Sequence, residues 1–248
     1  MFLYPERARK DRILPKNKIY GNAQLSRAMR QRFVTEIDQI VWRYVLGTEN
    51  LNLPARPGVE EIQVFEIALK TGQLKEDVLR TIDRAIPSVI FFELTFQGQV
   101  RFAAAYKRPP VSAAGESIAG PPVVEAYFET LWQPSTAPRL PLPVAVDLGG
   151  LYEQMLRQHM LASPLGLSPR AGESLAQTVN RGSQIRALRR ECQRLETALR
   201  KEIQFNRKVE INRELRQCMA DLETAAQVDP VAQKTKAALT GGLREAGL

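Results

Sequence analysis

The sequence predicts an α+β fold: a mainly antiparallel sheet packed with helices, followed by a long C-terminal helix of the coiled-coil type. Two observations predict the sheet domain. Short runs rich in Val, Ile, Phe and Tyr are separated by turn residues, and amphipathic segments with helical spacing lie between them. A third observation predicts the long helix, because residues 183–226 contain no proline or glycine and carry apolar residues three and four positions apart.

The first predicted element is an amphipathic helix at residues 22–46. Leu25, Met29 and Phe33 share one helical face, which continues through Ile37, and Gly47 ends the segment. We expect this face to pack on the core of the sheet domain.

The predicted strands lie at residues 59–70, 89–96, 100–107 and 124–132. A helix at residues 75–85 separates the first two, and a tight turn at residues 97–99 joins the second and third into a hairpin. The proline-rich segments 109–122 and 134–143 are predicted loops, and a short helix is expected at residues 151–161.

Composition shifts along the chain predict its domain organisation. We expect an α+β domain at residues 1–162, a linker at 163–173, a long helical assembly segment at 174–226 and a flexible tail at 227–248. Within the assembly segment, Ile185, Leu188, Cys192, Leu195 and Leu199 form an apolar seam. A single helix over residues 183–226 would be about 65 Å long at ~1.5 Å per residue, so we expect the seam to lie against a partner.

Composition also limits the class of protein. The 248 residues are 44% hydrophobic, which is enough for a folded core, and no apolar run approaches the roughly 18 residues of a membrane span. We therefore expect a cytoplasmic protein with no membrane association. Both cysteines fall in the helical run and are interpreted as small seam residues, since no second pair or histidine cluster accompanies them to make a metal site.

Catalytic signals are sparse, so the sequence favours a protein that is not an enzyme and needs no cofactor. The one histidine, His159, has no neighbouring acid or nucleophile in the sequence, and no glycine-rich phosphate loop is present. An alternative is a Mg²⁺-dependent nuclease centred on the carboxylates of a predicted strand, with Glu61, Gln63 and Glu66 as its residues. Its spacing is imperfect, because Ala68 stands where a nuclease would place a lysine.

The helical segment carries the candidate partner-binding residues. The seam contributes four apolar side chains, and a polar block at residues 204–212 interrupts it, as expected where polar residues fix register or partner choice. The full set comprises Ile185, Leu188, Leu195, Leu199, Gln204, Phe205, Asn206, Val209 and Asn212. An exposed helix surface without a partner explains the block equally well.

A surplus of positive charge points to nucleic acid or an acidic protein face as a second contact. The formal net charge is +8, and part of the surplus lies along the helical segment. The candidate phosphate contacts are Arg189, Arg190, Lys201, Arg207 and Lys208. Solvated helix faces need similar charge, so this pattern alone leaves both interpretations open.

Four short sequences carry a resemblance to a known family: LPK at residues 14–16, IVWRYVL at 40–46, EIQVFEI at 61–67 and QFNRKVEIN at 204–212. In their order they resemble an uncharacterised bacterial family of about this length. The resemblance implies a genomic setting beside DNA helicases and DNA methyltransferases of restriction-like or phage-defence systems, and it implies no activity.

Residues and resemblance together lead us to expect an accessory subunit without catalytic activity. It would dock a helicase or methyltransferase through the long helix, with nearby cations contacting DNA phosphates. The alternatives are the Mg²⁺ nuclease and a homodimeric coiled coil that associates through the same seam.

Overall fold

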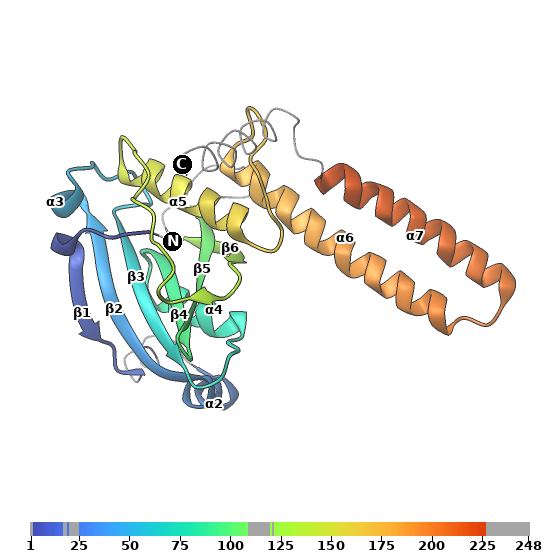
Figure 1. The fold of residues 1–248 in the computed structure, drawn as a ribbon, viewed down its shortest axis with the longest axis horizontal. Helices are drawn as coiled ribbons and strands as arrows, with labels where there is room; N and C mark the ends of the chain where they lie inside the picture. The colour runs from blue at the N-terminus through green and yellow to red at the C-terminus, as the bar shows by residue number, and fades with distance from the viewer. Residues whose placement is uncertain (1, 17–18, 20–24, 109–119, 121, 227–248) are drawn as a thin grey trace, which may run out of the picture. The chain divides into compact units, whose positions relative to one another are not determined.

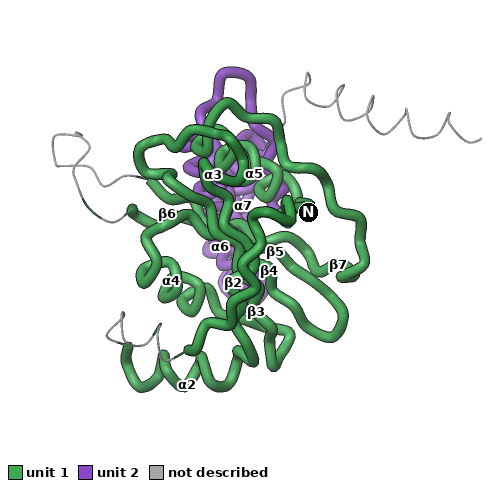
Figure 2. The backbone as a smooth tube through the Cα atoms, turned by 90° about the vertical axis from the view of Figure 1, so that its left-hand side faces the viewer, with its two compact units in different colours: residues 1–164 green, residues 165–248 purple. Residues whose placement is uncertain are grey.

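The computed structural model describes residues 2–16, 19, 25–108, 120 and 122–226. The predicted tail at 227–248 and nearly all of the predicted loop at 109–122 lie outside these residues. The chain divides into two compact units, Met1–Pro164 and Leu165–Leu248, which Figure 2 distinguishes by colour.

The first unit is built on one sheet of seven strands within the described residues. The strands β1 to β6 lie side by side in sequence order, and β7 pairs with β5. All neighbours are antiparallel except β3 and β4, which confirms the predicted mainly antiparallel α+β fold. The strands are β1 (Arg9–Ile13), β2 (Ile37–Gly47), β3 (Glu61–Leu69), β4 (Val89–Phe96), β5 (Gln99–Arg108), β6 (Val123–Glu129) and β7 (Gln133–Pro134).

One face of the sheet carries the helices α2 (Arg27–Glu36) and α4 (Glu76–Ala85). Helix α4 is the crossover that the parallel β3–β4 pair requires, because parallel neighbours are not joined by a tight turn. Phe33 of α2 and Ile82 of α4 share one core with alternate residues of the strands, among them Phe92. This core holds the sheet and both helices together.

The opposite face of the sheet is covered in part by α5 (Leu148–Ala162). Asp147 caps this helix by accepting a hydrogen bond from the Gly150 N–H at 2.7 Å. Phe91, which alternates with Phe92 along β4, meets the ring of Tyr152 in α5 at a centroid distance of 6.2 Å. Two shorter elements, η1 (Glu6–Ala8) and α3 (Thr48–Leu51), also belong to the unit.

The predicted helix at residues 22–46 is wrong in its second half. Helix α2 ends at Glu36, and the chain continues directly into β2, where Trp42 pairs with Phe65 of β3. The apolar residues of 37–46 fit helical spacing, but they are mostly β-branched or aromatic, the types that pack well on a sheet. Pairing with β3 on one side and β1 on the other makes this segment a strand and not a helix.

The predicted turn between the second and third strands is confirmed. Gln97 and Gly98 connect β4 to β5 with φ angles of 46° and 75°. Positive φ at both central residues is the geometry of a two-residue hairpin whose twist matches that of its strands.

Within its described residues, the second unit has α6 (Leu175–Lys201) and α7 (Phe205–Ala226) in place of the single helix expected over residues 183–226. Figure 1 shows them side by side and antiparallel, and their shared core contains Cys192, Leu195, Ile211, Leu215 and Cys218. We call this pair the helical hairpin. A disulfide between Cys192 and Cys218 links the two helices, so the cysteines are seam residues as predicted and are also bonded to each other.

Candidate functional site

The helical hairpin contains all the residues that the sequence predicts for partner binding. Four of them, Ile185, Leu188, Leu195 and Leu199, lie on α6. Ile185 and Leu195 are buried, and Leu188 and Leu199 pack against the core that α6 shares with α7. The closed hairpin therefore satisfies most of the apolar seam from within the chain, and the seam is not an open surface for another protein.

The remaining predicted residues lie where the chain reverses. Gln204, Phe205, Asn206 and Val209 are exposed, and Asn212 is half-buried at the next turn of α7. We define the hairpin tip as residues 200–209. The exposed fractions are 90% for Ile203, 78% for Phe205 and 54% for Val209. The predicted partner-binding residues did not include Ile203, because the sequence predicted one continuous helix through this position.

The carboxylate of Glu202 shapes the reversal at the tip. Its Oε1 accepts hydrogen bonds from the backbone N–H groups of Ile203 at 2.8 Å and Gln204 at 2.9 Å. These bonds, the one from Gln204 first, lower the pKa of Glu202. The carbonyl of Gln204 then accepts from the Lys208 N–H at 2.9 Å, which starts α7. The apolar side chains are thus displayed on an ordered turn.

All five predicted phosphate contacts are exposed, but they divide into two groups. Lys201, Arg207 and Lys208 belong to the tip, whereas Arg189 and Arg190 lie along α6. Arg207 forms an ion pair with Glu210 at 2.7 Å. The other four form no ion pair within the part of the chain that the structure describes. The tip therefore combines exposed apolar side chains with positive charge.

The open end of the hairpin is held by a buried ion pair that sequence analysis missed. Arg181 of α6 meets Glu173 in two hydrogen bonds, each 2.8 Å long, and also donates to the Ser168 carbonyl at 2.7 Å. Arg181 lowers the pKa of Glu173 to about 2. Arg170 donates to the carbonyls of Thr224 and Ala225 in the last turn of α7, where a cation is favoured by the helix dipole. The only signal in the sequence was the surplus of arginine.

The residues of the alternative nuclease reading do not come together. Glu61 and Gln63 lie on the face of β3 that meets Ser88, whose hydroxyl donates to Glu61 Oε1 at 2.9 Å. Glu66 lies on the opposite face of the same strand, as its odd spacing from the other two requires. There Arg43 binds it through two hydrogen bonds of 2.9 and 3.0 Å.

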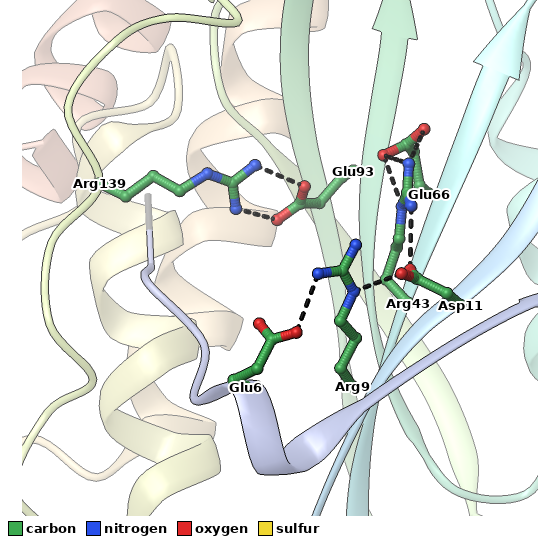
Figure 3. A network of polar contacts seen from close by, with 7 residues as sticks. All are labelled: Glu6, Arg9, Asp11, Arg43, Glu66, Glu93 and Arg139. Carbon is green, nitrogen blue, oxygen red and sulfur yellow. Dashed lines mark hydrogen bonds and ion pairs between the residues drawn. The ribbon is translucent and has the colours of Figure 1, made fainter.

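Glu66 belongs to a network of carboxylates and arginines on one face of the sheet (Figure 3). It neighbours Glu93 across the parallel β3–β4 pair, and Arg139 holds Glu93 through two hydrogen bonds of 2.7 and 2.8 Å. Arg43 also donates to Asp11 at 2.9 Å, and Asp11 in turn contacts Arg9. Glu66 and Glu93 are thus each neutralised by one arginine in a two-pronged geometry. Among the described residues, no three His, Cys, Asp or Glu side chains gather as a metal site would need.

Comparison with known proteins assigns the chain to a family. Residues 2–222 match the model of a domain of unknown function (DUF4391), and the chain belongs to this family. No curated protein and no solved structure matches it. Among the helices that the structure describes, none is long and apolar enough to cross a membrane.

Proposed function

We propose that this chain is an accessory subunit without catalytic activity that docks onto a DNA-processing enzyme through the hairpin tip. The partner we propose is a DNA helicase or methyltransferase of a bacterial phage-defence or restriction-like system, which is the setting that the sequence resemblance implies. The observation that carries the docking proposal is the exposure of Ile203, Phe205 and Val209 together on one ordered turn.

Phe205 is the strongest single indicator of a docking surface. Of the phenylalanines, all of which lie in the described part of the chain, it is the one that is exposed. Burying a phenylalanine side chain contributes about 1.5–3 kcal/mol, and aromatic anchors of this kind dominate the binding energy of many interfaces. Because the tip side chains are not needed for the hairpin core, their exposure is best accounted for by a partner that covers them.

The charge of the tip supports a partner that works on DNA. Lys201 and Lys208 stand beside the apolar side chains, where they are positioned to meet an acidic rim on the partner or the phosphates of DNA bound to it. Phosphate contacts of this kind weaken steeply with salt, whereas the apolar contact does not. We propose that the apolar side chains carry the docking and that the lysines add a salt-dependent contribution.

Affinity purification of the tagged full-length chain from its native cell, with nuclease treatment and mass spectrometry, tests the proposal. The wild-type chain is expected to recover a helicase or methyltransferase. The Phe205→Asp variant is expected to lose it, because a carboxylate at the centre of an apolar contact is costly to desolvate. Val146 is the matched control: it is 83% exposed and lies in the other unit, so Val146→Asp introduces the same carboxylate at an exposed apolar position away from the tip.

Two outcomes would refute docking through the tip. One is equal recovery of the enzyme with wild type and Phe205→Asp, and the other is recovery of no DNA-processing enzyme by the wild type. The observations favour this proposal over a homodimer that associates through the seam, because the closed hairpin already covers Leu195 and packs Leu188 and Leu199 against its core. A wild-type chain that is dimeric by light scattering, and that stays dimeric in Phe205→Asp, would reverse that preference.

A further inference from the structure

The first unit contains a cavity of about 500 Å³ beside the end of α5, a volume within the range of small-molecule sites. Its walls come from the N-terminal segment, from β5, from the β6–β7 connection and from the last turn of α5. Three aromatic side chains contribute to it: Phe2, Phe102 and Trp132. All of these residues belong to one compact unit, so the cavity does not depend on the placement of the hairpin.

Exposed apolar side chains gather around this cavity. Leu131, Leu140 and Leu161 all line it, although they are 68%, 55% and 45% exposed. Large hydrophobic side chains that remain exposed at one place mark binding surfaces more often than scattered ones do. The wall thus offers apolar surface from several elements, as expected for a site that takes an apolar ligand.

His159, the one histidine of the chain, also lines the cavity and is 2% exposed. Its Nδ1 lies 3.0 Å from the Met155 carbonyl oxygen, so Nδ1 carries the proton and donates it. Burial among Phe2, Phe91 and Phe102 lowers the pKa of His159 to about 4, so the ring is neutral at pH 7.

The second ring nitrogen, Nε2, is consequently a hydrogen-bond acceptor. It is buried and has no hydrogen-bond partner within the described residues. Such an atom is rare in folded proteins, because a buried polar group without a partner costs free energy. Phe2, whose ring centroid lies 6.0 Å from that of the imidazole, is shared between the histidine and the cavity wall. Because Nε2 is shielded from solvent, a side chain of this wall would have to shift before a ligand could reach it.

We propose that this cavity binds a small, largely apolar ring compound that carries one hydroxyl or N–H group, and that this group donates a hydrogen bond to Nε2 of His159. The aromatic and leucine side chains supply the apolar contact area, and the histidine selects for the donor. The inference stands apart from the docking proposal, because it concerns a different unit and different residues.

Two probes of similar shape test the selection for a donor: 2-naphthol, which has a hydroxyl group, and 2-methylnaphthalene, which has a methyl group in its place. We expect the wild-type chain to bind 2-naphthol about tenfold more tightly in NMR titrations, since the methyl compound leaves Nε2 without a partner. In the His159→Phe variant the two probes are expected to bind equally. The single histidine also gives a direct signal, because its ¹⁵Nε2 resonance should shift with 2-naphthol and not with the other probe.

A second pair of variants locates the binding without disturbing the buried histidine. Leu131→Arg places a charge at an exposed position of the wall and is expected to weaken both probes about tenfold. Val146→Arg makes the corresponding change at an exposed residue outside the cavity and should bind as wild type does. The proposal is overturned if the wild type binds neither probe, if it binds both equally with an unmoved ¹⁵Nε2 resonance, or if Leu131→Arg has no effect.

Discussion

A buried ion pair in the first unit permits a quantitative test of how this fold is stabilised. Lys107 Nζ lies 2.7 Å from Asp83 Oδ1, and neither side chain is more than 2% exposed. Lys107 also donates to the Ser88 carbonyl at 2.6 Å, and the Tyr127 hydroxyl donates to the other oxygen of Asp83. The pair thus joins α4 to β5, and the Tyr127 hydroxyl links it to β6.

Removing one charge from this pair leaves the other buried without compensation. The Asp83→Asn variant keeps the shape and an acceptor for Tyr127 but leaves the ammonium of Lys107 unpaired, and we expect a loss of about 3–5 kcal/mol in the free energy of unfolding. Lys107→Met leaves a carboxyl group whose pKa burial already raises, so this carboxyl takes up a proton and the loss is smaller. The double variant removes both charges, and its free energy of unfolding should lie within about 1.5 kcal/mol of the wild-type value.

Urea denaturation followed by tryptophan fluorescence measures these differences in the relevant unit. Trp42 and Trp132 are the only two tryptophans, and both lie in the first unit. In Lys107→Met the folded state holds the Asp83 proton to higher pH than the unfolded state, so the stability of this variant should rise as the pH falls from 7 toward 4. Single variants that each cost less than about 1 kcal/mol, or a double variant that costs the sum of the two, would refute the reasoning.

Three further predictions concern other parts of the chain. His159 has a folded-state pKa of about 4 against 6.5 for an ordinary histidine, so the unfolded chain takes up its proton first as the pH falls. The free energy of unfolding should therefore fall by about 3 kcal/mol between pH 7 and pH 4. His159→Phe should remove this pH dependence in denaturation followed by fluorescence. Cys192→Ser removes a cross-link between residues 26 apart and should lower hairpin stability by about 3.5 kcal/mol in hydrogen exchange of α6 and α7, and a reductant should bring wild type to the same level. Glu66→Gln weakens the two-pronged contact with Arg43 and should lower the free energy of unfolding by about 1 kcal/mol. We expect no change in a Mg²⁺-dependent DNA cleavage assay. Loss of a cleavage activity that the wild type shows would restore the nuclease hypothesis.

Most of the sheet was predictable because its strands combine β-prone composition with clear turns. The run that forms β4 and the turn at Gln97 and Gly98 each carried a local signal, and the structure follows them. The segment of β2 did not, because Ile37, Ile40, Val41 and Tyr44 follow helical spacing, and irregularities in the β2–β3 register interrupt the alternation of a regular strand. Its identity depends on the neighbouring strands, which lie elsewhere in the sequence.

The candidate sites were predictable to different degrees for the same reason. The spacing of Leu188, Leu195 and their neighbours correctly indicated an apolar seam. Spacing does not show which surface covers such a seam, and here it is the chain's own α7. No proline or glycine marks the reversal at Glu202, whose side chain forms the turn by accepting backbone hydrogen bonds. The cavity around His159 draws its walls from segments far apart in the sequence, so no local pattern could reveal it.

The position of the reversal also determines which substitutions separate folding from docking. A charge at Leu195 would enter the hairpin core and damage both, so its effect on partner binding would not identify an interface. Phe205 lies just beyond the turn and is 78% exposed, so Phe205→Asp should leave the urea midpoint and the hydrogen exchange of α6 nearly unchanged. A loss of partner with an intact hairpin would therefore assign the contact to the tip, whereas a loss that accompanies unfolding of α6 would show that Phe205 supports the hairpin itself.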